Sequence, residues 1–301
     1  MRVSSNMVPN ILADLQQSQS TLNTVLQEVA TGKRVNLPSD DPAASSQMVQ
    51  NTLETANVDQ YTKNINSVLA NVQQAGSALS SVVTSLTQAV SLGTQGANGT
   101  NSASNLAAIA QQVQSILSAV VAAANTSVGG TYLFGGTNTT TAPYTADSSS
   151  STGYTYNGNS NSNSVAIGDN LNVQVNLPGS QIFSDSTNNV IGTLNSLVSA
   201  LQSGNSAQIS AATSSISAAI DTVSQAQGFY SNAASQLNAQ ETSLQQDTVT
   251  LTTQQNSLVG VDEAQAATQL SQAETANSAI LAAAAKVLPN TLLNYLSTPS
   301  A

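Results

Sequence analysis

The segment TGKRVNLPSDDPAA, residues 31–44, gathers the side chains most able to do chemistry in this chain. It holds two of the five Lys and Arg residues among 301 residues, followed directly by Asp40 and Asp41. Glycine before lysine suggests a phosphate-binding loop, and adjacent carboxylates suggest acid-base catalysis. The phosphate-loop pattern fails, because it needs Gly at position 27 and Ser or Thr at position 34, where Gln27 and Arg34 stand.

The other chemical patterns are equally weak. The glycine-rich run GGTYLFGG, residues 129–136, lacks the spacing of a dinucleotide-binding fingerprint. A hydrolytic centre in the middle of the chain would need paired carboxylates, and the acidic residues there are far apart in sequence. They are Asp147, Asp169 and Asp185.

Composition removes most reaction types. The chain has no Cys, His or Trp, so thiol nucleophiles, disulfides, histidine acid-base chemistry and the usual zinc ligands are excluded. Carboxylates, tyrosines and Lys286 remain, but only 7% of residues are charged. We therefore expect a protein that is not an enzyme, with no catalytic residue, cofactor or metal.

Charge and hydropathy limit the kinds of partner that the chain can bind. A net charge of −10 cannot supply the basic surface that nucleic acid or anionic lipid requires. The N-terminus runs straight into an amphipathic pattern, and no stretch approaches the roughly 20 apolar residues of a membrane span. We expect neither a cleaved signal nor an anchor, and neither nucleic acid nor a membrane as partner.

The opening segment is better explained as a joint between two helices. Gly32 suits the left-handed cap that ends a helix, with Lys33 and Arg34 placed to favour its negative end. Asp41 before Pro42 is typical of an N-cap followed by proline at the first helical position, and Ser39 and Asp40 add hydrogen-bond acceptors and negative charge there. The residues assigned to this domain joint are Gly32, Arg34, Asn36, Asp40 and Asp41.

Seven-residue spacing of apolar residues predicts long helices over most of the chain. The ranges are 8–29, 42–92 (ended by Gly93 and the Asn98-Gly99 turn), 102–126, 190–201, 209–258 (interrupted at Gly260) and a final segment to Pro289. The helix over 42–92 would be roughly 75 Å long, which requires a rod rather than a sphere.

The first and last helices offer only narrow apolar stripes. Two such helices bury little alone, so we expect them to pair with each other and to gain most of their burial from neighbouring copies of the chain. The residues of this assembly seam are Val8, Ile11, Leu15, Leu22, Val29, Leu270, Ile280, Leu281, Leu288, Leu293 and Leu296.

Between about Gly129 and Phe183 the apolar period changes to two, as in strands. Leu171, Val173, Val175 and Leu177 alternate with polar residues, and Asn157-Gly158 signals a hairpin turn. The predicted fold is mainly α, a coiled-coil-like rod built by both halves of the chain with a small β-rich insert. Its domains are 1–40 with 261–301, 41–128 with 189–260, and 129–188.

The joint resembles that of the bacterial flagellin family, and Gln95 to Asn101 resembles the turn between the first two rod helices of flagellin. The motif at 130–137, the N-terminus MRVSSNM and the C-terminal segments 267–272 and 292–296 are more similar to the hook-associated junction proteins of that family. The resemblance implies a structural subunit at the hook–filament junction. It further implies export through the flagellar type III channel without a cleaved signal, to an extracellular location in the flagellum.

The same resemblance implies the partners. They are other copies of the chain in a tubular layer, the other hook-side junction protein, flagellin and an export chaperone. Two alternatives of other kinds stay open: a filament-forming flagellin with a small outer domain, and an unrelated coiled-coil adhesin or phage fibre. A trimeric adhesin should show a secretory signal and a membrane barrel, for which the sequence gives no pattern.

Overall fold

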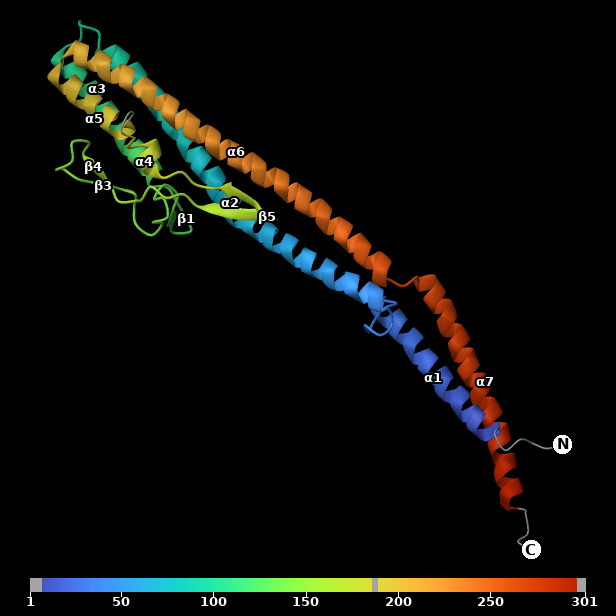
Figure 1. The fold of residues 1–301 in the computed structure, drawn as a ribbon. Helices are drawn as coiled ribbons and strands as arrows, with labels where there is room; N and C mark the ends of the chain where they lie inside the picture. The colour runs from blue at the N-terminus through green and yellow to red at the C-terminus, as the bar shows by residue number, and fades with distance from the viewer. Residues whose placement is uncertain (1–6, 186–188, 297–301) are drawn as a thin grey trace. The chain divides into compact units, whose positions relative to one another are not determined.

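The computed structural model describes residues 7–185 and 189–296, and side chains over 9–185 and 189–286. The chain forms two compact units, one of Met1–Asn57 with Asp247–Ala301 and the other of Val58–Gln246. The helices (Figure 1) are α1 Met7–Thr31, α2 Pro42–Gly96, α3 Ala103–Ala124, α4 Gly179–Ile182, α5 Val190–Ser203, α6 Ser206–Val259 and α7 Glu263–Leu296. The strands are β1 Ser127–Val128, β2 Thr131–Tyr132, β3 Tyr144–Ala146, β4 Tyr154–Tyr156, β5 Ser164–Gly168 and β6 Leu171–Gln174. A mainly α fold with a small β-rich region is therefore confirmed.

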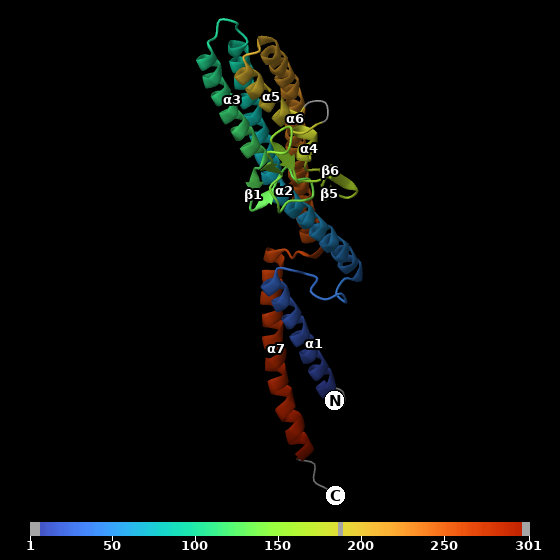
Figure 2. The same ribbon diagram turned by 90° about the vertical axis from the view of Figure 1, so that its left-hand side faces the viewer.

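In the first unit, α1 lies along α7 (Figure 2). Each helix turns a stripe with alternating spacing of three and four toward the other, and alanines fill the most enclosed positions on α7. The stripe residues that are buried or half-buried are Ile11, Leu15, Ser18, Leu22 and Val25 on α1 and Ala266, Leu270, Ala273, Asn277, Ile280 and Ala284 on α7. Most of the larger apolar side chains in the stripe are only half-buried.

The start of α7 is capped locally. The Asp262 carboxylate accepts hydrogen bonds from the backbone N–H groups of Ala264 (3.0 Å) and Gln265 (3.1 Å). The sequence pattern carried this helix only to Pro289, but α7 continues to Leu296. Proline removes one backbone donor without obliging a helix to end.

In the second unit, α2 and α6 carry the predicted seven-residue repeats of apolar residues, called ladders below. Both bury residues seven apart along their length, as a long paired helix requires. The buried ladder residues are Val58, Ile65, Val72, Leu79 and Leu86 on α2 and Ile209, Ile216, Val223, Tyr230, Leu237 and Leu244 on α6.

Gly93 does not end α2, contrary to the sequence prediction, since the helix runs to Gly96. Gly93 instead lies against α6, where a Cβ would collide with the side chain of Thr213. A Cβ at Gly96 would collide with Leu201 in the same way. The glycines therefore allow close helix packing rather than marking a helix end.

The helix α3 packs beside α5 (Figure 2). An 18-residue window of α3 has mean hydropathy 1.5, so by length and composition it would qualify as a membrane span. The expectation that no stretch approaches one is thus wrong. The apolar residues of α3 include Leu106, Val113 and Leu117, which are buried in the core that α3 shares with the neighbouring helices.

The central region forms three separate two-stranded antiparallel ribbons: β1 with β2, β3 with β4, and β5 with β6. Gly129 and Gly130 make the first turn with positive φ values of 58° and 81°. The hairpin turn predicted at Asn157-Gly158 is wrong. Asn157 donates its backbone N–H to the Pro143 carbonyl (2.8 Å), which extends the β3–β4 pairing, and the chain reverses before β4 instead.

That reversal is held by Asp147. Its carboxylate accepts hydrogen bonds from the Ser149 hydroxyl (2.6 Å), the Thr155 hydroxyl (2.6 Å) and the Ser149 backbone N–H (2.9 Å). These bonds favour the charged form, the Ser149 hydroxyl most, and hold the pKa of Asp147 at about 2. Hydrogen bonds to the Asp147 carboxylate therefore help to hold the loop between β3 and β4.

Aromatic rings attach this region to α6. Phe134 packs edge-on against Phe183 (centroids 5.4 Å apart) and Tyr230 (6.2 Å), and all three are fully buried. The Tyr230 hydroxyl accepts a hydrogen bond from the Leu177 backbone N–H at 2.9 Å. Burial raises the pKa of Tyr230 to about 12.

The variant Phe134→Ala should therefore lower the free energy of unfolding by about 3–5 kcal/mol, because it leaves a cavity between two rings. Urea unfolding followed by far-UV circular dichroism measures the loss. The matched control is Phe229→Ala on α6, where the ring is half-buried and contacts Tyr230 from the side. A loss at Phe134 no larger than at Phe229 would contradict the central place of this ring.

Candidate assembly joint

The segment after α1 doubles back along the chain that leaves α6. Gly32 takes the left-handed conformation with φ 65°, which ends α1 at Thr31 as predicted. The backbone then pairs with residues far along the sequence. The Arg34 N–H donates to the Val259 carbonyl (2.7 Å), and the Val261 N–H donates to the Gly32 carbonyl (3.1 Å).

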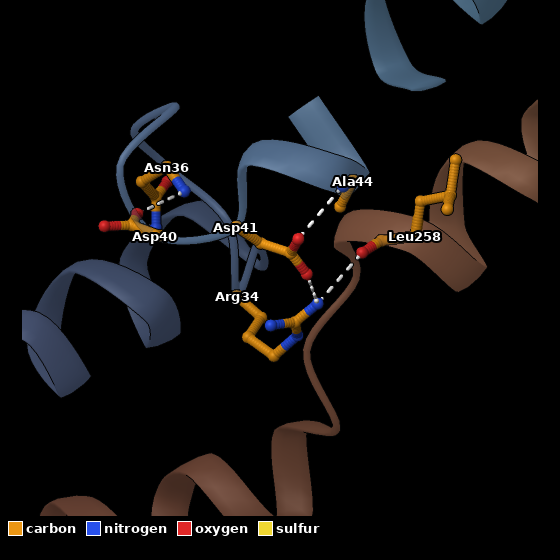
Figure 3. Close-up of polar contacts among 6 residues, drawn as sticks. All are labelled: Arg34, Asn36, Asp40, Asp41, Ala44 and Leu258. Atoms are coloured by element: carbon orange, nitrogen blue, oxygen red, sulfur yellow. Dashed lines mark hydrogen bonds and ion pairs between the residues drawn. The ribbon is translucent and has the colours of Figure 1, made fainter. Parts of the chain in front are cut away.

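Arg34 links three parts of the joint (Figure 3). Its guanidinium donates to the Asp41 carboxylate and to the Leu258 carbonyl, each at 3.2 Å. The sequence predicts this charge at the negative end of α1. The structure places it instead at the carbonyl end of α6, where a cation is equally favourable.

Asp41 caps α2 at its first turn. One carboxylate oxygen accepts the Ala44 backbone N–H at 3.0 Å (Figure 3). Pro42 occupies the first helical position. The Ala44 N–H, and after it the Arg34 guanidinium, hold the pKa of Asp41 below its usual value near 3.8. The sequence predicts this cap.

Asp40 and Asn36 close the loop between the two helices. The Asp40 carboxylate accepts the backbone N–H groups of Asn36 (3.0 Å) and Leu37 (2.8 Å). The Asn36 amide donates to the Lys33 carbonyl at 2.8 Å and accepts the Thr31 hydroxyl at 2.9 Å. Asp40 thus orders the loop itself, where the sequence predicts only a hydrogen-bond acceptor and negative charge near α2.

A small apolar cluster lies under the loop. Val35, Ala44 and Val259 are buried there, with Met48 and Leu258 packed against them. Sequence reasoning missed Leu258, Val259 and Gly260 as joint residues. The sequence does carry a signal for them, because the seven-residue leucine repeat ends at Leu258 and Gly260 follows it. The chain is thus interrupted both after α1 and after α6, and two such interruptions can lie opposite each other.

The structure does not bring all the assembly-seam residues together. Ile11, Leu15, Leu22, Leu270 and Ile280 are half-buried in the α1–α7 stripe. Val29 (44% exposed) and Leu281 (47% exposed) lie outside it. The side chains of Val8, Leu288, Leu293 and Leu296 fall outside the part of the chain whose side chains are described.

Two leucines that the sequence analysis did not assign are also exposed on α1. Leu12 is 57% exposed and Leu26 is 44% exposed. Among the described side chains of α1, Val25 alone is buried. The helix therefore presents apolar side chains both toward α7 and away from it.

The polar side chains of the joint are hydrogen-bonded to the backbone and to one another. Within the described residues there is no group of three or more His, Cys, Asp or Glu side chains placed to hold a metal ion. The carboxylates of the joint are used as acceptors of backbone N–H groups and of one guanidinium. Their arrangement ties the end of α6 to the start of α2.

The variant Gly32→Val should destabilise the joint by about 1–2 kcal/mol, because a β-branched residue is strained at positive φ. A Cβ at Gly32 meets no atom within 4 Å, so crowding contributes nothing. The matched variant Gly32→Asn should lose less, since asparagine tolerates the left-handed region. Urea unfolding of the three proteins tests this, and equal midpoints for Val and Gly would contradict it.

The capping role of Asp41 should make the free energy of unfolding depend on pH in the acid range. Its pKa is lower in the folded chain than in the unfolded one, so its contribution is present above the unfolded pKa near 3.8 and lost as pH falls through the folded pKa. Asp41→Asn should flatten this part of the pH profile of unfolding. A profile identical to that of the parent chain would show that the cap contributes nothing.

Comparison with known proteins finds similarity over the part of the chain that contains the joint. A model of the bacterial flagellin N-terminal helical region matches residues 3–139. The flagellar hook-associated protein 3 of Escherichia coli (strain K12) is 34% identical over 149 residues, which are 49% of this chain and 47% of that protein. The chain is similar to flagellins and to a flagellar hook-associated protein, in each case over part of its length.

Other flagellar proteins are similar to the chain over different spans. A flagellin of Salmonella muenchen is 31% identical over 100 residues, or 33% of this chain and 20% of that one. The crystal structure of Bacillus cereus FlgL matches 69% of this chain and 99% of that chain, with 26% identity and a TM-score of 0.59. The chain spans about half the length of the curated hook-associated relative, 47%.

Proposed function

We propose that this chain is a structural subunit of the bacterial flagellum at the hook–filament junction, joining the hook-side layer to the flagellin filament. The observation that carries the proposal is the α1–α7 pair, whose narrow stripe leaves Leu12, Leu26, Val29 and Leu281 exposed. Large exposed apolar side chains on one helix pair are typical of a surface that another chain covers.

The similarity to hook-associated relatives supports this place in the flagellum. The match to a hook-associated protein extends over 149 residues, whereas the flagellin match extends over 100. A filament-forming flagellin with a small outer domain is the second candidate, favoured by that flagellin match.

The proposed division of labour follows the sequence domains. Residues 1–40 with 261–301 form the assembly domain, 41–128 with 189–260 the helical rod, and 129–188 the outer β-rich domain. The assembly seam makes contacts between copies, and the joint residues set how the assembly domain leaves the rod. The chain acts as a structural subunit without catalysis.

The proposed partners are other copies of this chain, the other hook-side junction protein, flagellin and an export chaperone. The proposed route is export through the flagellar type III apparatus without a cleaved signal, and the proposed location is extracellular.

The test is to label this chain and image isolated hook-basal bodies with attached filaments. Label confined to a short zone between hook and filament is the expected result. Label along the whole filament would favour flagellin, and no label on the flagellum would overturn the proposal.

A further inference from the structure

The sequence contains two Asn-Gly pairs, Asn98-Gly99 and Asn157-Gly158. Where glycine follows asparagine, the glycine backbone nitrogen is unhindered by a side chain and can attack the asparagine side-chain carbonyl carbon. The reaction needs the local backbone to rotate. The fold of this chain therefore decides which pair reacts.

We propose that Asn98-Gly99 is a site of spontaneous covalent modification and that the fold protects Asn157-Gly158. A bond forms between the Gly99 nitrogen and the Asn98 Cγ, the Cγ–NH₂ bond breaks, and ammonia leaves with the proton from the Gly99 nitrogen. Water then opens the cyclic imide to aspartate or isoaspartate. The reaction consumes only water, and the inference does not depend on the proposed function.

The Asn98-Gly99 pair is open to attack in the turn between α2 and α3. Both residues are exposed, and a Cβ at Gly99 meets no atom within 4 Å. In this fully described turn, neither the Asn98 side-chain nitrogen, which must leave, nor the Gly99 nitrogen, which must attack, donates a hydrogen bond. The Asn98 side-chain oxygen accepts the Thr100 N–H (3.2 Å) and hydroxyl (3.0 Å), which draws electrons from Cγ.

The turn can survive the rotation. The Asn98 carbonyl accepts the Asn101 backbone N–H (3.1 Å) and side-chain amide (3.0 Å), and rotation at Asn98 disturbs these two bonds. The Asn101 amide also donates to the Gln95 carbonyl at 2.7 Å. The end of α2 therefore remains tied to the start of α3 while Asn98 reorients.

The Asn157-Gly158 pair is held on both sides. The Asn157 side-chain nitrogen donates to the Thr145 hydroxyl at 2.9 Å, and its backbone N–H donates to the Pro143 carbonyl at 2.8 Å. The Tyr156 ring lies over Gly158, where an added Cβ would collide with it. Rotation here must break these hydrogen bonds and displace the ring.

The test follows both pairs in one molecule. The full chain is incubated folded in mildly alkaline buffer made with heavy-oxygen water, and a parallel sample is incubated in urea. Pepsin digestion in acid, where the imide does not form, and mass spectrometry then quantify conversion at each pair. The folded chain should react roughly tenfold or more faster at Asn98 than at Asn157, as expected for the loss of one or two net hydrogen bonds.

The product should carry heavy oxygen, because water opens the imide. In urea the two rates should converge, since the local sequences are both Asn-Gly. Gly99→Ala should slow the reaction at Asn98 and leave Asn157 unchanged. Equal rates in the folded chain, a faster rate at Asn157, or no product at Asn98 while the unfolded chain reacts would each overturn the proposal.

Discussion

The double variant Leu12→Asp, Leu26→Asp is expected to lose incorporation into the flagellum while keeping the helical content of the parent chain. Both leucines are exposed in the isolated chain, at 57% and 44%, so an aspartate there stays in water. If neighbouring copies cover this face, each aspartate becomes an unpaired buried charge that costs several kcal/mol. Complementation of a strain lacking the chain, scored by filament number, gives the readout.

Two further variants sharpen the result. Gln17→Asp with Thr24→Asp places the same charges at exposed polar positions on a different face of α1 and should assemble more nearly like the parent chain. Leu15→Asp with Leu22→Asp places them at half-buried stripe positions and should also loosen α1 from α7, which far-UV circular dichroism detects. Normal filament numbers from the Leu12, Leu26 variant would contradict the proposal that neighbouring copies cover this face of α1.

The helices were predictable because their signal is local and repeated. The ladder from Val58 to Leu86 keeps a seven-residue spacing, which only a helix places on one face. The caps of the joint follow for the same reason. Gly32 and the Asp41-Pro42 pair act through bonds within a few residues, so the residue types alone indicate what they do.

The distant half of the joint was not predictable in this way. Arg34 donates to the carbonyl of Leu258, 224 residues away, and any cation near any helix end would satisfy the same electrostatics. A pattern of residue types can show that Arg34 suits a helix C-terminus. It cannot choose between α1 and α6, because the choice depends on how the chain returns.

Predictions from glycine were wrong at two positions where a tertiary contact determines the role of the residue. Gly93 is needed for close approach to Thr213, although glycine late in a helix is typical of a terminus. Asn157-Gly158 has the residues of a tight hairpin turn, but Asn157 is already paired with Pro143 and Thr145. In both cases a longer-range contact overrides the local preference.

The proposed junction role makes a second large prediction, about growth of the purified chain. A flagellin makes the same head-to-tail contact repeatedly, and such a heterologous interface does not close, so it yields a long helical polymer. A junction subunit has one side adapted to the hook-side layer and another adapted to the filament, so its own copies need not propagate. The two roles share helices, joint and seams, which is why helical periodicity cannot separate them.

We expect the purified chain to remain monomeric or to form only short oligomers at concentrations at which a flagellin control polymerises, as followed by light scattering and electron microscopy. Cells lacking the chain should build hooks and shed flagellin into the medium, because the filament has no layer on which to grow. Restoring the chain should return flagellin to the cell surface. Long filaments grown from the purified chain alone would contradict the junction role and make filament-forming flagellin the better assignment.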